Sequence, residues 1–178
     1  MINILQLVGI TLLEEKKMAK IVDKFLEEQH FNDLKNLVTG ISFPWFFINN
    51  LNDEGNEDKD FYFYMSHLLY DNNQPTSNYF DAFVPLLSTI GYKALIRVKA
   101  NLYPRTKTLR HNGMHVDTDY DHKGFLFYFN TCDSKTILKD MEVDCVANRG
   151  VYFNPSILHS SSSCTNVQAR FSLNVNYF

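Results

Sequence analysis

The second half of the chain contains many short apolar stretches separated by turn residues, and their spacing limits the folds open to it. After Gly91, eight strand-like segments follow one another within about 85 residues, which leaves no room for the crossover helices that parallel strands require. The sheet is therefore expected to be mostly antiparallel, which predicts a jelly roll or a sandwich. The predicted strands cover residues 94–103, 109–116, 124–130, 136–138, 142–146, 151–153, 157–160 and 168–177.

The first half of the chain carries helical patterns instead. Apolar residues at spacings of three and four predict an amphipathic helix over residues 11–38, with Thr11 and Glu14 as a capping box. A second helix is predicted over 79–90 and ends at Gly91. Strands are predicted over 43–49 and 61–70. The apolar face of the first helix must be buried, and we expect it to pack on the outer surface of the sheet.

The length and composition fit one β-rich α+β domain. A chain of 178 residues can bury one sizeable core, and its 15 Phe and 10 Tyr suit strands better than helical bundles. We therefore expect a single domain over residues 1–178. Residues 1–91 would supply helical support and outer strands, and residues 92–178 the jelly-roll core that carries the site.

The charge and the cysteines exclude several classes of protein. A formal charge of −3 lacks the basic excess of a general nucleic-acid binder. Three cysteines without a CxxC spacing argue against a disulfide framework and a thiolate zinc site, so we interpret them as buried free thiols. We see no signal peptide and no apolar run of about 20 residues, which predicts a soluble cytoplasmic protein without a membrane partner. The oligomeric state stays open.

Two predicted strands carry a wholly polar face. In residues 168–177 and 94–103, polar and apolar side chains alternate, so each strand has one face of each kind. These polar faces comprise Gln168, Arg170, Ser172, Asn174 and Asn176 on one strand, and Arg97, Lys99, Asn101 and Tyr103 on the other. They fit either a sheet with one solvated side or a barrel with a polar, hydrated interior that binds a ligand. The pattern alone does not distinguish the two.

Three residues are candidate metal ligands. His115 and Asp117 are two positions apart, so on an extended segment both side chains point to the same face. His159 lies 42 residues beyond Asp117 (159 − 117), and the strands between them can fold back to bring it alongside. Two imidazoles and one carboxylate form a facial triad, which leaves about half of an octahedral iron(II) open. Such an open site indicates catalysis.

Arg170 is the candidate anion-binding residue. It follows His159 by 11 positions (170 − 159), which is enough for one strand, a short turn and the start of the neighbouring antiparallel strand. A buried guanidinium needs an anion, and the far carboxylate of a dicarboxylate bound to iron could supply it. Ser172, on the same face, adds a hydroxyl.

The pattern His115-x-Asp117, His159 and Arg170-x-Ser172 resembles the signature of the 2-oxoglutarate and iron(II)-dependent oxygenases. The stretch 127–130 (Phe-Tyr-Phe-Asn) is similar to their prolyl-hydroxylase-like branch. The resemblance covers about residues 94–178. It implies a double-stranded β-helix that binds Fe(II), 2-oxoglutarate and O2.

The resemblance also implies the reaction. Such an enzyme releases succinate and CO2 and hydroxylates a C–H bond, here of a prolyl or other amino-acid side chain in a peptide or a small molecule. The family's tyrosine near the cosubstrate makes Tyr103 and Asn101 further candidates for that pocket. A nucleic-acid demethylase would carry a second arginine where Asn176 stands, so nucleic acid is disfavoured as a substrate. Collagen-type prolyl hydroxylases use lysine at the place of Arg170, so the site looks more like that of the arginine-using relatives.

Two other functions remain open from the sequence. One is a cupin-like metal protein that acts as a dioxygenase or isomerase without 2-oxoglutarate. The other is a non-catalytic jelly-roll binding module in which His115 and Asp117 are incidental. Among the other histidines, we expect His111 either to contact the metal ligands from behind or to lie at the rim of the site, and we interpret His67 as an ordinary core or surface residue.

Overall fold

The computed structural model describes residues 19–48, 63–139 and 141–178, and these residues form a β-rich fold with two helices. The helices are α2 (Glu28–Thr39) and α3 (Phe80–Ile90). The strands are β1 (Ala19–Val22), β2 (Phe46–Ile48), β3 (Tyr64–Asp71), β4 (Gln74–Pro75), β5 (Leu95–Pro104), β6 (Lys123–Tyr128), β7 (Lys135–Leu138), β8 (Met141–Asp144), β9 (Arg149–Phe153), β10 (His159–Ser161) and β11 (Ala169–Tyr177).

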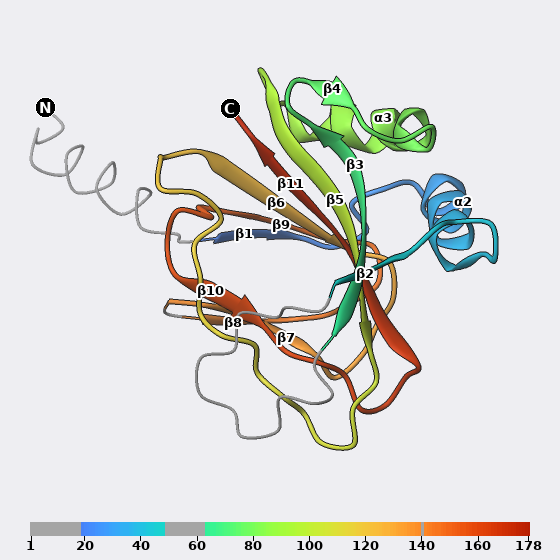
Figure 1. The fold of residues 1–178 in the computed structure, drawn as a ribbon, viewed down its shortest axis with the longest axis vertical. Coiled ribbons are helices and arrows are strands. Elements are labelled where there is room, and N and C mark those ends of the chain that lie inside the picture. The colour runs from blue at the N-terminus through green and yellow to red at the C-terminus, as the bar shows by residue number, and fades with distance from the viewer. Residues whose placement is uncertain (1–18, 49–62, 140) are drawn as a thin grey trace, which may run out of the picture.

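The strands form two sheets. The larger sheet has the order β1-β9-β6-β11-β5-β3-β2, with β4 paired to β3, and the smaller has the order β10-β7-β8. Every ladder between these strands is antiparallel. Figure 1 shows the smaller sheet on one side of the larger one and the two helices on the other. The predicted antiparallel jelly roll with buttressing helices is confirmed.

The outer face of the larger sheet packs against the helices. Its apolar side chains join those of α2 and α3 in one core cluster, in which Leu173 and Val175 of β11 are completely buried. A fully buried side chain of this size contributes about 1.5–3 kcal/mol relative to an exposed one. The helices therefore stabilise the sheet on the side away from the smaller sheet.

The inner face of the larger sheet meets the smaller sheet in a second apolar cluster. Leu126 and Val151 contribute from the larger sheet, and Leu138 and Val143 from the smaller one. The cysteines lie here as buried free thiols, as expected: Cys132, Cys145 and Cys164. This cluster fills only the part of the inner face near β6 and β9.

The predicted helix over residues 11–38 is wrong for residues 19–27, which are not helical. Residues 11–18 and the capping box lie outside the described residues, β1 occupies Ala19–Val22, and α2 begins only at Glu28. The side chain of Asn148 explains part of the difference, because it accepts a hydrogen bond from the backbone N–H of Leu26 and donates one to its carbonyl oxygen. Pairing with β9 and with this distant asparagine overrides the local helical spacing.

The predicted strand over 109–116 is also wrong. This segment makes only isolated backbone bridges, from His111 to Ser162 and from His115 to His159. It is an irregular connection between β5 and β6 that touches the end of the smaller sheet at separate points. The predicted second helix is confirmed, and Gly91 ends it with a φ of 77°, the left-handed conformation that glycine favours.

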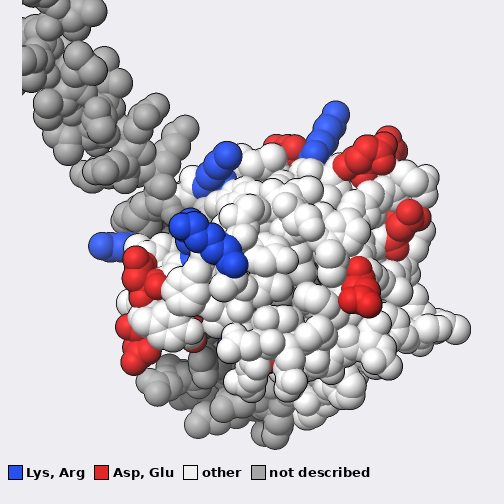
Figure 2. Space-filling view, turned by 90° about the horizontal axis from the view of Figure 1, so that it is seen from above, with Lys and Arg blue, Asp and Glu red and all other residues white. Residues whose placement is uncertain are grey.

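The distribution of surface charge and the character of the helices are relevant to binding of nucleic acids and membranes. Figure 2 shows one face of the molecule on which basic and acidic side chains lie in separate small groups with uncharged surface between them, so this face of the described chain has no continuous basic field. Neither of the helices that the structure describes has the length and apolar character needed to cross a membrane.

Candidate metal centre

The polar faces of β5 and β11 line the interior of the fold. The two strands pair so that Tyr103 is opposite Arg170, Asn101 opposite Ser172, Lys99 opposite Asn174 and Arg97 opposite Asn176. The side chains of Asn101 and Arg170 are only 4% and 1% exposed. Of the two interpretations that the sequence left open, the structure therefore has the polar face enclosed in the interior and not on a solvated side of the sheet.

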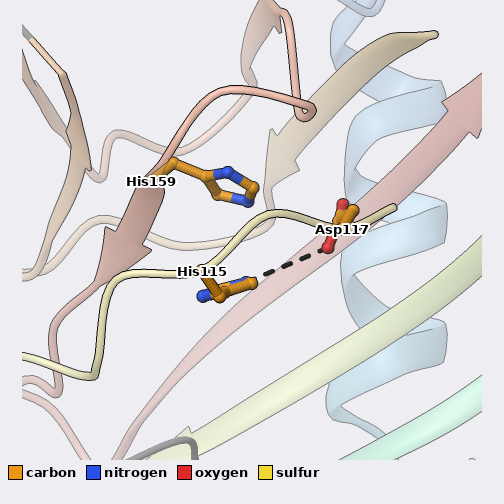
Figure 3. A group of neighbouring side chains, drawn as sticks. All are labelled: His115, Asp117 and His159. Atoms are coloured by element: carbon orange, nitrogen blue, oxygen red, sulfur yellow. Dashed lines mark ion pairs between the residues drawn. The ribbon is translucent and has the colours of Figure 1, made fainter. Parts of the chain in front are cut away.

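The structure brings the three candidate ligands together. Their ligand atoms all lie within 4.8 Å of one another. Figure 3 shows His115 and Asp117 on the connection between β5 and β6 and His159 on β10, with the side chains pointing toward one another. The backbones of His115 and His159 exchange two hydrogen bonds of 2.9 Å, and this pairing places the imidazole rings 4.5 Å apart between centroids.

The backbone orients both imidazoles for metal binding. The Nδ1 atom of His115 lies 3.2 Å from the carbonyl oxygen of Gly113, and that of His159 lies 2.9 Å from the carbonyl oxygen of Ile157. A proton on each Nδ1 satisfies the carbonyl and leaves the Nε2 lone pair free, which is how metal-bound histidines are commonly fixed. Burial lowers the pKa of His159, which favours the neutral imidazole that a metal needs.

The carboxylate of Asp117 is held by three donors. Its Oδ1 lies 3.2 Å from a guanidinium nitrogen of Arg97, and its Oδ2 accepts hydrogen bonds from the amides of Asn174 and Asn176 at 3.3 and 3.1 Å. Burial raises the pKa of Asp117, but the charge of Arg97, the neighbouring His159 and the two amides outweigh burial and hold the pKa below its usual range. The carboxylate is therefore ionised and oriented before any metal arrives.

Arg170 is fully buried and has no carboxylate partner among the described residues. Its Nη atoms donate to Thr136 Oγ1 at 2.8 Å and to the carbonyl oxygens of Ser162 and Lys135 at 3.2 and 3.4 Å. Its Nε atom is buried and has no hydrogen-bond partner among residues 19–48, 63–139 and 141–178. A buried cation that meets only neutral acceptors is costly, and an anion in the cavity would offset that cost.

The remaining candidates for the cosubstrate pocket lie beside this guanidinium. Tyr103, Asn101 and Ser172 line the same small cavity as His115, His159 and Arg170. The centre of the guanidinium lies 5.5 Å from the centroid of the Tyr103 ring. Burial raises the pKa of Tyr103, so its hydroxyl stays protonated and can donate a hydrogen bond. All seven candidate residues thus face the same interior or its rim.

The sequence interpretation missed four contributors to the site. Thr136 contacts Arg170, while Arg97, Asn174 and Asn176 contact Asp117. The alternation of β5 and β11 already placed three of them on the polar face, but no local pattern connects them with Asp117, which comes from an irregular segment. His111 is exposed and does not belong to the cluster of ligand atoms.

Comparison with solved structures gives the class of fold. A prolyl hydroxylase from Trichoplax adhaerens in complex with a peptide fragment of hypoxia inducible factor has a TM-score of 0.67 at 14% identity, over 92% of this chain and 84% of that one. An oxidoreductase of the 2OG-Fe(II) oxygenase family from Burkholderia pseudomallei has a TM-score of 0.68 at 11% identity, over 92% and 86%. A prolyl-4-hydroxylase from Pseudomonas putida has a TM-score of 0.59 at 13% identity, over 96% and 98%.

These likenesses define the architecture as that of the 2-oxoglutarate and iron(II)-dependent oxygenases, with prolyl hydroxylases among the structures it resembles. The resemblance inferred from the motifs is thereby confirmed at the level of the fold. No family model matches the sequence, and the search of curated proteins finds no match either. The site's own chemistry must therefore carry the assignment of an activity.

Proposed function

We propose that this chain is an Fe(II)- and 2-oxoglutarate-dependent dioxygenase that hydroxylates a C–H bond of a prolyl or other amino-acid side chain, in a peptide or a small molecule. The observation that carries the proposal is one cavity lined by the imidazoles of His115 and His159 and by the buried guanidinium of Arg170, which has no carboxylate partner among the described residues. The carboxylate of Asp117 lies within 4.8 Å of the two imidazoles. This donor set fits Fe(II), and the unpartnered Nε of Arg170 fits the carboxylate of a dicarboxylate cosubstrate.

Each residue has a defined task in this proposal. His115, Asp117 and His159 would hold the metal, and a set of three protein ligands leaves coordination positions open for other molecules. Arg170 binds the far carboxylate of 2-oxoglutarate, and Ser172, Tyr103 and Asn101 position the cosubstrate from the surrounding walls. When bound, the iron with O2 and 2-oxoglutarate supplies the oxidation, which yields succinate, CO2 and a hydroxylated substrate. The buried walls exclude bulk water from the reaction.

The alternatives explain fewer of these contacts. A cupin-like protein that does not use 2-oxoglutarate has no need for the buried guanidinium of Arg170. A non-catalytic binding module has no need for the ordered contacts around Asp117, whose side chain is only 6% exposed. The peptide in the complex with the Trichoplax adhaerens hydroxylase supports a peptide or an amino-acid derivative as the substrate class.

An anaerobic titration with Fe(II) and 2-oxoglutarate tests the proposal. Formation of the chelate should give a visible charge-transfer band in the native protein, and His159→Ala should abolish it. His111→Ala is the matched control, because this exposed histidine lies on the same connection as His115 but does not join the ligand cluster, and it should keep the band. A folded native protein without the band would contradict the proposed function.

A further inference from the structure

Lys99 is a second cation on the inward face of β5, and no carboxylate of the described residues forms an ion pair with it. It lies between Arg97 and Asn101, its neighbours on that face. Its side chain is mostly buried, and within the described ranges its ammonium makes no ion pair. The contact it does make is with the ring of Tyr64, 5.6 Å from Nζ to the ring centroid. Lysine is rarely buried without a partner of opposite charge.

The surroundings disfavour the charge that Lys99 carries. Burial, together with the nearby charge of Arg97, lowers the pKa of Lys99 to about 8, although Asp117 acts in the opposite direction. Asp117 does not neutralise Lys99, because its two oxygens already receive Arg97, Asn174 and Asn176. A titratable group that is mostly buried without an ion pair and lies beside a candidate metal site is a candidate for ligand binding.

The position of Lys99 places it beside the metal ligands. Arg97, the next inward residue on β5, pairs with Asp117, and Asn174, directly opposite Lys99 on β11, donates to the same carboxylate. Lys99 does not line the cavity in front of Arg170. Asn174, opposite Lys99, does line that cavity. Lys99 is therefore close to the candidate metal and at the border of the space assigned to the cosubstrate.

A second group next to Lys99 also lacks a partner. The amide nitrogen of Asn174 is used by Asp117, whereas its Oδ1 atom is buried and has no hydrogen-bond partner in the described structure. The pair therefore offers one cation and one acceptor side by side. A ligand that satisfies both presents a carboxylate and, next to it, an N–H or O–H donor. Amino acids with a free or side-chain carboxylate have this combination.

We propose, on the basis of the oxygenase function proposed above, that Lys99 binds a carboxylate of the molecule to be hydroxylated. The substrate class is accordingly an acidic, amino-acid-like compound or a peptide with an acidic residue or a free carboxyl terminus at the reacting position. Lys99 acts as a specificity-determining residue, and Asn174 accepts a hydrogen bond from the same substrate.

Binding of matched pairs of small probes tests this assignment. Protein loaded with Mn(II) and saturating 2-oxoglutarate does not turn over, so equilibrium binding can be measured by calorimetry. The probes differ only in carboxylate against carboxamide: proline and prolinamide, N-acetylaspartate and N-acetylasparagine, and N-acetylglutamate and N-acetylglutamine. At least one carboxylate should bind about tenfold or more tightly than its amide, as a charge-assisted hydrogen bond predicts.

Variants of the lysine decide whether Lys99 is responsible. Lys99→Gln should reduce the preference for the carboxylate to less than twofold, and Lys99→Arg should keep most of it. Lys35→Gln is the matched control, because the ammonium of Lys35 also lies over an aromatic ring, 5.9 Å from the centroid of Phe31, but on α2. It should leave the preference unchanged. The proposal is overturned if no pair shows a preference or if the preference survives Lys99→Gln.

The same samples separate failure of this inference from failure of the oxygenase function. Binding of 2-oxoglutarate to the metal-loaded protein is measured first, and Lys99→Gln should change its affinity less than twofold. An equally large loss of 2-oxoglutarate and probe binding in this variant would make Lys99 a cosubstrate ligand and overturn the inference. Native protein that binds no 2-oxoglutarate would contradict the oxygenase function, and the probe pairs would then be titrated into metal-free protein.

Discussion

The two faces of strand β11 differ in what their burial achieves. On the outer face, Leu173 and Val175 pack against apolar side chains, and the helices cover them. On the inner face, Arg170 and Asn176 are also buried, but the Nε atom of Arg170 and the Oδ1 atom of Asn176 have no hydrogen-bond partner in the part of the chain that the structure describes. Burial on the outer face stabilises the fold, whereas burial on the inner face costs free energy that only a ligand would recover.

The largest effect is expected from replacing Arg170, the buried cation on the inner face of β11. Arg170→Met removes the cation but keeps a side chain of similar length, so 2-oxoglutarate affinity should fall at least about 100-fold. The cosubstrate-free variant should be as stable as the native protein or more stable by about 1–4 kcal/mol, because a buried unpaired charge is gone. Calorimetry and urea unfolding measure the two quantities. A clear loss of stability would mean that the guanidinium is a structural element.

Substitutions on the outer face of β11 should lower the stability of the fold and not the affinity for 2-oxoglutarate. Leu173→Ala should lower the free energy of unfolding by about 2–5 kcal/mol, because it opens a cavity under the helices. Ser172→Ala, one residue earlier on the inner face, should cost about 1 kcal/mol or less and instead weaken 2-oxoglutarate binding. Equal losses of stability in the two variants would remove the contrast between the faces.

The support of Asp117 can be tested through metal affinity. Asn176→Ala deletes the 3.1 Å hydrogen bond to the carboxylate, and loss of such a supporting contact commonly lowers metal affinity about 10–100-fold. A titration with Mn(II) measures this change. Tyr177→Phe, the adjacent residue on the outer face, should leave the affinity unchanged. The assignment fails if the two variants bind the metal alike.

The smallest effect is expected from His67, a histidine buried in the outer layer. Its Nε2 lies 2.7 Å from Ser77 Oγ, and burial lowers its pKa. The unfolded chain therefore binds a proton more readily than the folded one, and stability is lost as the pH falls below about 6.5. The lowered pKa of His159 acts in the same direction. Urea unfolding of His67→Gln between pH 7 and pH 5 should show a shallower pH dependence than that of the native protein, and an unchanged slope would contradict this role.

Strands β5 and β11 were predictable because polar and apolar residues alternate along them. In β5 and β11 every second residue is polar, and this period reports both the secondary structure and the shared face. The motif His115-x-Asp117 and the later His159 and Arg170 could be assigned together because few functions require that combination. Resemblance to a known family then supplied the expectation of a double-stranded β-helix.

The remaining features depend on contacts between distant parts of the chain. Residues 19–27 have helical spacing, yet β1 pairs with β9, and Phe25 and Leu26 are fixed by hydrogen bonds to Asn148. The irregular path of residues 109–116 follows from separate bridges to the segment around His159. Neither pairing leaves a periodic signal in the local sequence, so propensity alone could not predict it.

The alternation of β11 also constrains how the protein can fold. The strand is paired on both sides, with β5 and with β6, and a slip of one residue in either ladder would exchange its two faces. Arg170 would then enter the aromatic layer beneath the helices, and Leu173 would occupy the cavity. Such a misaligned state would bury a charge in a hydrocarbon environment, so it would be strongly disfavoured. The buried polar residues of β11 lower the stability of the native fold, but they also destabilise the misaligned strand pairing and so favour the native register.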